Sequence, residues 1–107
     1  MNVAIIGCGA IARKRHAPAL SKYEGACFYG VCDPVRENAD ELAETYHVKA
    51  FYDLGTLLSC KEVDAVIICT PERFHMANVI EALRAGKHVL CEKPLALNAG
   101  QAEEIVK

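Results

Sequence analysis

Short apolar runs alternate with helical segments along the chain, and this alternation constrains the fold more than any other feature. Five runs have the length and composition of buried β-strands: 3–6, 26–32, 50–52, 64–69 and 88–91. The helical segments are 10–22, 34–46, 53–58, 74–85 and 98–107. Strands separated by helices form a parallel sheet with crossover helices. The sequence therefore predicts one α/β domain, 1–107, with a Rossmann-type doubly wound sheet of about five strands in the order 3-2-1-4-5.

Single residues mark the ends of several predicted helices. Pro34 suits the first turn of the second helix, because proline has no N–H group to leave unpaired there. Asp53 is a predicted N-cap of the third helix, and Gly86 is a predicted C-terminal cap of the fourth. Asn98, with Gln101 three residues later, resembles a capping box that begins the last helix.

The composition excludes several classes of protein. Hydrophobic residues make up 52% of the 107 positions, which is enough to build a core and excludes a disordered chain. The net charge of −2 offers no basic surface for nucleic acid. No apolar run approaches the roughly 18 residues that cross a membrane, and the first residues lack the features of a signal peptide. We therefore expect a cytoplasmic protein with neither a nucleic-acid nor a membrane partner.

The cysteines indicate a reducing environment. They lie at positions 8, 27, 32, 60, 69 and 91, and no two of them form a C-x-x-C pair. Several fall within the apolar runs, so we expect reduced, buried thiols in place of a disulfide framework. Zinc would need clustered ligands, which this spacing does not provide. The sequence therefore predicts no metal site.

A glycine-rich turn follows the first strand and opens the first helix. Gly7, Gly9 and Ala12 form the G-x-G-x-x-A variant of the dinucleotide-binding fingerprint, with Ala10 and Ile11 between them. The first glycine permits the tight turn, the second lets the backbone approach a pyrophosphate, and the alanine lets the helix pack closely. The N–H groups and dipole at the helix start favour the anionic pyrophosphate. The alternative is an ordinary strand-to-helix turn.

An acidic residue ends the second strand at the expected distance from this turn. Asp33 follows Ala12 by 21 residues, and we expect its carboxylate to accept hydrogen bonds from the adenosine ribose. A carboxylate there repels a 2′-phosphate, which favours NAD over NADP as the cofactor. Arg36 can soften this repulsion. The alternatives are a helix N-cap for Asp33 and a solvated helix position for Arg36.

Two further motifs follow the fourth and fifth strands. Cys69-Thr70-Pro71-Glu72-Arg73-Phe74-His75 comes after one, and Cys91-Glu92-Lys93-Pro94 comes after the other. Open α/β sheets bind ligands at the carboxyl ends of their strands. In the predicted strand order, both motifs therefore face the same crevice as the glycine turn.

At this point the chain resembles the N-terminal domain of the glucose–fructose oxidoreductase / inositol dehydrogenase / rhizopine catabolism (Gfo/Idh/MocA) family. The resemblance extends over nearly all 107 residues and is carried by 3–12 with His16 and Leu20, 33–34, 70–71 with His75, and 82–96. The stretch 82–96 is the most diagnostic, because many dehydrogenases share the glycine motif. The resemblance implies a nicotinamide-dependent oxidoreductase acting on a sugar, cyclitol or related hydroxy compound.

The resemblance also implies roles for residues in the two motifs. Lys93, of the Glu-Lys-Pro motif, would lie near the nicotinamide ribose and the substrate hydroxyl, where its charge holds the substrate oxygen and supports proton transfer. Glu92 would orient this lysine or line the pocket, and Pro94 completes the cofactor-binding motif. The spacing alone favours a different interpretation, because a Lys-Pro pair at the end of a strand usually forms a simple turn.

Three residues after the fourth strand receive implied roles as well. Thr70 and Pro71 would pass under the dinucleotide, and His75 would sit close to its nicotinamide half. A capping or packing role is the alternative for His75.

Members of this family continue into a second α/β domain with the substrate pocket. We expect that domain and a sixth strand to be missing here, so that the chain is a fragment without turnover of its own. We also expect a homo-oligomer, because the fifth strand would be an open sheet edge. Two other functions stay open: a stand-alone regulatory dinucleotide-binding module, and a reductase of another substrate class, such as bile pigments or imines.

Overall fold

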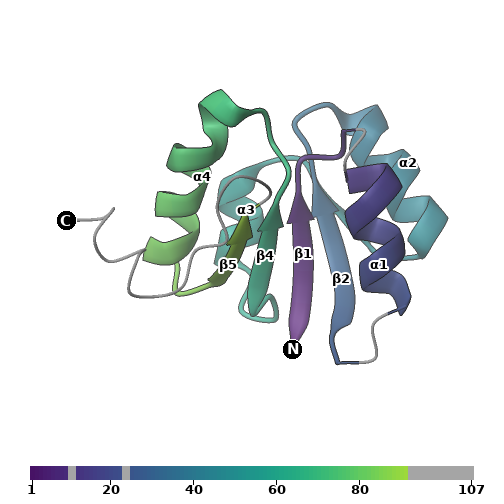
Figure 1. The fold of residues 1–107 in the computed structure, drawn as a ribbon, viewed down its shortest axis with the longest axis horizontal. Helices are drawn as coiled ribbons and strands as arrows, with labels where there is room; N and C mark the ends of the chain where they lie inside the picture. The colour runs from purple at the N-terminus through teal and green to yellow at the C-terminus, as the bar shows by residue number, and fades with distance from the viewer. Residues whose placement is uncertain (10–11, 23–24, 92–107) are drawn as a thin grey trace.

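The structure is a computed structural model that describes residues 1–9, 12–22 and 25–91, with the backbone but not the side chains of 13, 14, 72, 75, 90 and 91. Within these residues, five parallel strands form one sheet in the order β3-β2-β1-β4-β5 (Figure 1). The strands are β1 (Asn2–Ile6), β2 (Cys27–Cys32), β3 (Lys49–Phe51), β4 (Ala65–Ile68) and β5 (His88–Cys91). The helices are α1 (Ala17–Lys22), which follows a π-helical turn (Ala12–His16), then α2 (Arg36–Tyr46), α3 (Leu54–Ser59) and α4 (Glu72–Arg84).

The core is divided between the two faces of the sheet, because successive side chains of a strand point to opposite faces. On one face, Ile5 packs with residues of α1 and α2, including Leu20 and Leu42. On the other face, Ile6 packs with residues of α3 and α4, including Leu57. Helices therefore cover both faces, as a doubly wound sheet requires.

The predicted fold class and strand order are confirmed, and the strand boundaries agree to within about two residues. The Asp53 carboxylate caps α3 as predicted, since it accepts a hydrogen bond from the backbone N–H of Thr56 at 3.1 Å. Gly86 adopts a φ of +80° just after the end of α4, as expected of a C-terminal cap. The predicted helix 98–107 lies outside the described residues.

The predicted starts of two helices are wrong. The π-helical turn Ala12–His16 precedes α1, so the segment 12–22 is not one regular α-helix. Helix α2 begins at Arg36, with Val35 at its N-cap position, so Pro34 is outside its first turn. The cause is the Asp33 side chain, which accepts a hydrogen bond from the Val35 N–H at 2.8 Å and folds this segment into a turn before the helix.

The cysteine prediction is correct for two residues and wrong for one. Cys8 and Cys32 are buried. Cys27 is exposed, because β2 becomes buried only from Gly30 onwards. The described residues contain no cluster of three or more side chains suited to a metal ion, and none of their helices is long and apolar enough to cross a membrane.

Candidate functional site

The register of the sheet brings the ends of three strands to one level. Ile6 of β1 pairs with Cys32 of β2 on one side and with Ile68 of β4 on the other. Gly7 and Asp33 therefore leave the sheet next to each other. The backbone N–H of Gly7 donates to the carbonyl of Cys32 at 2.7 Å and fixes this arrangement.

A crevice of about 300 Å³ opens at this edge, at the point where the strand order reverses. It is lined by Ile6, Gly7, Cys32, Pro34, Tyr52, Asp53, Leu54, Thr70, Phe74 and Asn78. The predicted residues Gly7 and Thr70 thus share one crevice, and Asp33 lies between two of its lining residues in the sequence. Such a switch point is where open α/β sheets bind ligands.

The two glycines of the turn are there for different reasons. Gly7 has a φ of +93°, and a Cβ atom on it would lie 2.9 Å from backbone atoms of Cys69 and Thr70. The fold itself therefore requires this glycine. A Cβ atom on Gly9 would meet no described atom within 4 Å. Among the described residues there is no packing reason for glycine at this position, and the space they leave above it suits the backbone approach of a ligand.

Of the remaining positions of the fingerprint, the structure describes Ala12. Ala12 is completely buried in the core beneath α1 and α2, which suits a helix packed closely on the sheet. Ala10 and Ile11 lie outside the described residues.

The Asp33 carboxylate bridges the glycine turn and the start of the second crossover. One of its oxygens accepts a hydrogen bond from the Cys8 N–H at 2.9 Å, and the other accepts one from the Val35 N–H at 2.8 Å. Asp33 is half-buried, so part of the carboxylate stays accessible. Each oxygen keeps a further lone pair with which it can accept a ligand hydroxyl.

The wall beside Asp33 combines apolar and acidic groups. Burial raises the pKa of the Cys32 thiol to about 11, so this lining residue stays uncharged at neutral pH. Asp53 is on the same wall, and hydrogen bonds from the hydroxyl and the N–H of Thr56 lower the pKa of its carboxyl group. Its charge therefore adds to that of Asp33 and makes this end of the crevice unfavourable for additional negative charge.

Arg36 lies at the beginning of α2 on the same side. Its guanidinium carbon is 4.2 Å from the centre of the Tyr52 ring, so the two groups are stacked. The Tyr52 hydroxyl donates a hydrogen bond to the carboxylate of Asp40, one turn further along α2. Arg36, predicted near the cofactor, is thus held against a residue that lines the crevice.

The opposite wall comes from the end of β4 and the first turns of α4. The Thr70 hydroxyl donates a hydrogen bond to the side-chain oxygen of Asn78 at 2.6 Å. Pro71 is exposed and occupies the N-cap position of α4, and Phe74 is 46% exposed. His75 follows in the same helix, where the structure describes its backbone but not its side chain.

Sequence reasoning missed Asn78 and Tyr52 as lining residues. Asn78 is four residues after Phe74, a spacing that places the two on one face of a helix, and this signal could have indicated it. Tyr52 immediately precedes the predicted N-cap, but nothing in the local sequence shows that its ring contacts Arg36.

The Glu-Lys-Pro motif begins just after β5. Cys91 pairs with Ile68 at the end of β4, so the chain leaves both strands at the same edge of the sheet. Glu92, Lys93 and Pro94 themselves lie outside the described residues.

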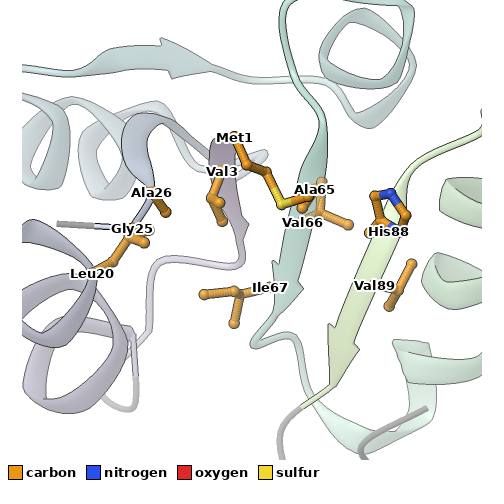
Figure 2. A pocket seen from close by; sticks show the side chains of 10 residues that line it. All are labelled: Met1, Val3, Leu20, Gly25, Ala26, Ala65, Val66, Ile67, His88 and Val89. Atoms are coloured by element: carbon orange, nitrogen blue, oxygen red, sulfur yellow. The ribbon is translucent and has the colours of Figure 1, made fainter. Parts of the chain in front are cut away.

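A second hollow, of about 360 Å³, lies near the amino ends of β1, β4 and β5 (Figure 2). Except for His88, its lining is apolar and includes Val3, Leu20, Ala65 and Ile67. Its described lining includes no carboxylate side chain, and it lies at the opposite end of the strands from Gly7 and Asp33. We therefore assign the candidate site to the crevice at the carboxyl ends.

The strand, the glycine turn, the acid after β2 and the crevice at the switch point define a Rossmann domain. Over residues 1–107, the sequence matches the Gfo/Idh/MocA family, described as an oxidoreductase family with an NAD-binding Rossmann fold. The chain belongs to this family.

Similar proteins include several dehydrogenases. The chain is 39% identical over 106 residues to D-glucoside 3-dehydrogenase of Escherichia coli (strain K12), a match that covers 98% of this chain and 30% of that protein. It is 34% identical over 108 residues to myo-inositol 2-dehydrogenase of Thermotoga maritima, covering 100% of this chain and 32% of that protein. The chain thus spans about a third of the length of these relatives.

A solved structure with the same fold carries a dinucleotide. KijD10, a 3-ketoreductase from Actinomadura kijaniata, was crystallised in complex with TDP-benzene and NADP in an open conformation. It matches this chain with a TM-score of 0.87 and 34% sequence identity, over 98% of this chain and 33% of KijD10.

The contrast between the two glycines gives a testable prediction. We expect Gly9→Ala to leave the free energy of unfolding within about 0.5 kcal/mol of wild type, since its Cβ would meet no atom of the described residues within 4 Å. If the turn binds a pyrophosphate, the same change should lower the affinity for NAD and NADP at least tenfold, because the methyl group would obstruct its approach. Urea unfolding and calorimetric titration measure the two quantities.

Gly7→Ala is the matched comparison. Its positive φ and its backbone contacts predict a destabilisation of roughly 2 kcal/mol or more. If Gly9→Ala bound both dinucleotides as well as wild type does, the assignment of the turn would be wrong.

Proposed function

We propose that the chain is the dinucleotide-binding part of an NAD(P)-dependent oxidoreductase that transfers a hydride between nicotinamide and a sugar, cyclitol or related hydroxy or keto compound. The observation that carries the proposal is the space that the described residues leave above Gly9, beside the half-buried Asp33 carboxylate. Family membership and the names of the similar dehydrogenases support it.

Different residues of the chain would bind different parts of the dinucleotide. The backbone at Gly7 and Gly9 would receive the pyrophosphate, together with Ala10, Ile11 and Ala12 at the helix start. Asp33 would accept hydrogen bonds from the adenosine ribose through the lone pairs that Cys8 and Val35 leave available. When bound, the nicotinamide supplies a carbon that accepts or gives the hydride.

The second wall would position the other half of the cofactor. Thr70 and Pro71 follow β4 and would lie under the dinucleotide. The bond from Thr70 to Asn78 fixes the hydroxyl and keeps this wall in one arrangement. His75, further along α4, would face the nicotinamide half.

Chemistry on the substrate would fall to the Glu-Lys-Pro motif. The Lys93 ammonium would hold the substrate oxygen and move its proton as the carbon changes between alcohol and ketone. Glu92 would orient that lysine, and Pro94 would fix the turn after β5. A regulatory binding module has no use for an ammonium group at this position, so Lys93 separates the two functions.

The preferred cofactor under this proposal is NAD. A 2′-phosphate would meet the Asp33 carboxylate and, on the same wall, the charge of Asp53. KijD10 binds NADP, so the fold accepts either cofactor and the choice depends on such local charges.

The Asp33 charge can be tested by titration. Wild type should bind NAD more tightly than NADP, and Asp33→Ala should weaken NAD binding by roughly 10-fold or more, the usual size of a lost hydrogen bond to a charged group. NADP binding should fall less, because the repulsion disappears as well. Asp33→Asn is the matched control, since it removes the charge and nearly preserves the shape. Equal or tighter binding of NADP by wild type would contradict the choice of NAD.

Lys93 can be tested in the enzyme that contains this chain. Lys93→Ala should lower kcat by about 100-fold or more, the range of a positioned acid–base group, while NAD affinity changes little. Lys61→Ala is the control, because Lys61 is exposed in the turn before β4. The chain of 107 residues by itself should show no substantial turnover of polyols. A near-normal kcat for Lys93→Ala would remove this lysine from the mechanism.

The edge of the sheet supports a proposal about assembly. Among the described strands, β5 pairs with β4 on one side and forms the edge of the sheet on the other. Edge strands present unpaired N–H and C=O groups that pair with another chain. We therefore propose a homo-oligomer. We also propose that the protein acts on a small molecule in the cytoplasm.

Light scattering over a concentration series tests the assembly. The average mass should rise with concentration as the edges pair. The His88 N–H donates to the Asp64 carbonyl on the β4 side, so the next N–H along β5, that of Val89, points to the open edge. Val89→Pro removes that N–H group and should reduce this rise. A strictly monomeric chain at high concentration would show that something else covers β5.

A further inference from the structure

We infer that Tyr52 influences the choice between NAD and NADP by engaging Arg36 in a cation–π contact that competes with a 2′-phosphate for the guanidinium. The inference rests on the proposed function, because it concerns the adenosine end of the same crevice. It assigns to Tyr52 a positioning role that acts through Arg36.

The contacts of Tyr52 come from two residues of one helix. Tyr52 follows β3 and lines the crevice, whereas Arg36 and Asp40 lie one turn apart on α2. The guanidinium carbon of Arg36 is 4.2 Å from the centre of the Tyr52 ring, and the Tyr52 hydroxyl donates to Asp40. The hydrogen bond to Asp40 raises the pKa of Tyr52, so the hydroxyl remains a donor at neutral pH. The ring is thus held at its face and at its hydroxyl.

The position of Arg36 determines what it can do for a ligand. It is three residues after Asp33, and a guanidinium in this region is suited to a 2′-phosphate, which it binds through two parallel hydrogen bonds. Under this inference, the Tyr52 ring and a 2′-phosphate compete for the guanidinium. NADP therefore loses the cation–π contact when it recruits Arg36, whereas NAD does not require Arg36 to move.

The expected effect is small and has a definite sign. A cation–π contact at an exposed site corresponds to about a 2- to 5-fold change in an equilibrium constant. Removing the ring should therefore increase NADP affinity relative to NAD affinity by this factor. The ratio of affinities is the useful quantity, because loss of packing in the crevice affects both dinucleotides alike.

Calorimetric titration of four variants with NAD and NADP tests the inference. Tyr52→Leu removes the ring and keeps an apolar lining, so the ratio should shift toward NADP by about 2- to 5-fold. Tyr52→Phe keeps the ring, and its ratio should stay within about 2-fold of wild type. The double variant Tyr52→Leu/Arg36→Ala should lose the shift, since the freed guanidinium is absent. A shift that is absent in Tyr52→Leu, or that persists without Arg36, would overturn the inference.

The fourth variant, Arg36→Ala, still tests the premise that Arg36 is engaged by Tyr52 if Tyr52→Leu does not fold, which thermal unfolding would show. Because wild-type Arg36 is held by Tyr52, its removal should change the ratio by less than about 2-fold. A loss of NADP affinity above 5-fold would show that Arg36 already serves the phosphate, against the inference. If wild type bound neither dinucleotide, the proposed function and this inference would both be wrong. If wild type preferred NADP, only the proposed choice of NAD would be wrong, and the shifts would still decide the role of Tyr52.

Discussion

The Asp33 carboxylate connects the two loops on which the candidate site depends. It accepts hydrogen bonds from Cys8 in the glycine turn and from Val35 before α2, so one side chain fixes both connections. The two bonds also delay the start of α2 until Arg36. Because Arg36 begins the helix at that point, its guanidinium comes over the ring of Tyr52. The Asp33 carboxylate, predicted from the sequence to bind the ribose, therefore also fixes the conformation of the two loops beside it.

The close approach of β1 and β4 is the second constraint. A Cβ atom on Gly7 would touch the backbone after β4, so the turn can leave β1 at this level only as glycine. This contact places the turn beside Thr70 and closes one side of the crevice. The same proximity explains why substitutions at Gly7 and Gly9 should have separate effects, one on the fold and one on the ligand.

Much of the fold could be predicted from the sequence, because buried parallel strands leave short apolar runs and the glycine turn after the first strand indicates the doubly wound order 3-2-1-4-5. Gly7 and Thr70 were expected at one edge, and the crevice contains both. The start of α2 was not predictable from proline preference, since the hydrogen bond from the Val35 backbone N–H to the Asp33 carboxylate overrides it. The stacking of Arg36 on Tyr52 joins segments separated by a helix, and local patterns carry no record of such contacts. The role of Lys93 stays a prediction.

The central claim is that NAD binds at the glycine turn beside Asp33. Backbone amide chemical shifts during a titration with NAD test it most directly, because the shift of each amide depends on its own surroundings. The account predicts that the largest changes occur at Cys8, Gly9 and Val35, where the turn and the Asp33 carboxylate meet the ligand. Residues of the apolar hollow at the opposite end, such as Leu20 and Ala65, should change little. Changes concentrated in that hollow, or none at the glycine turn at saturating NAD, would contradict the account.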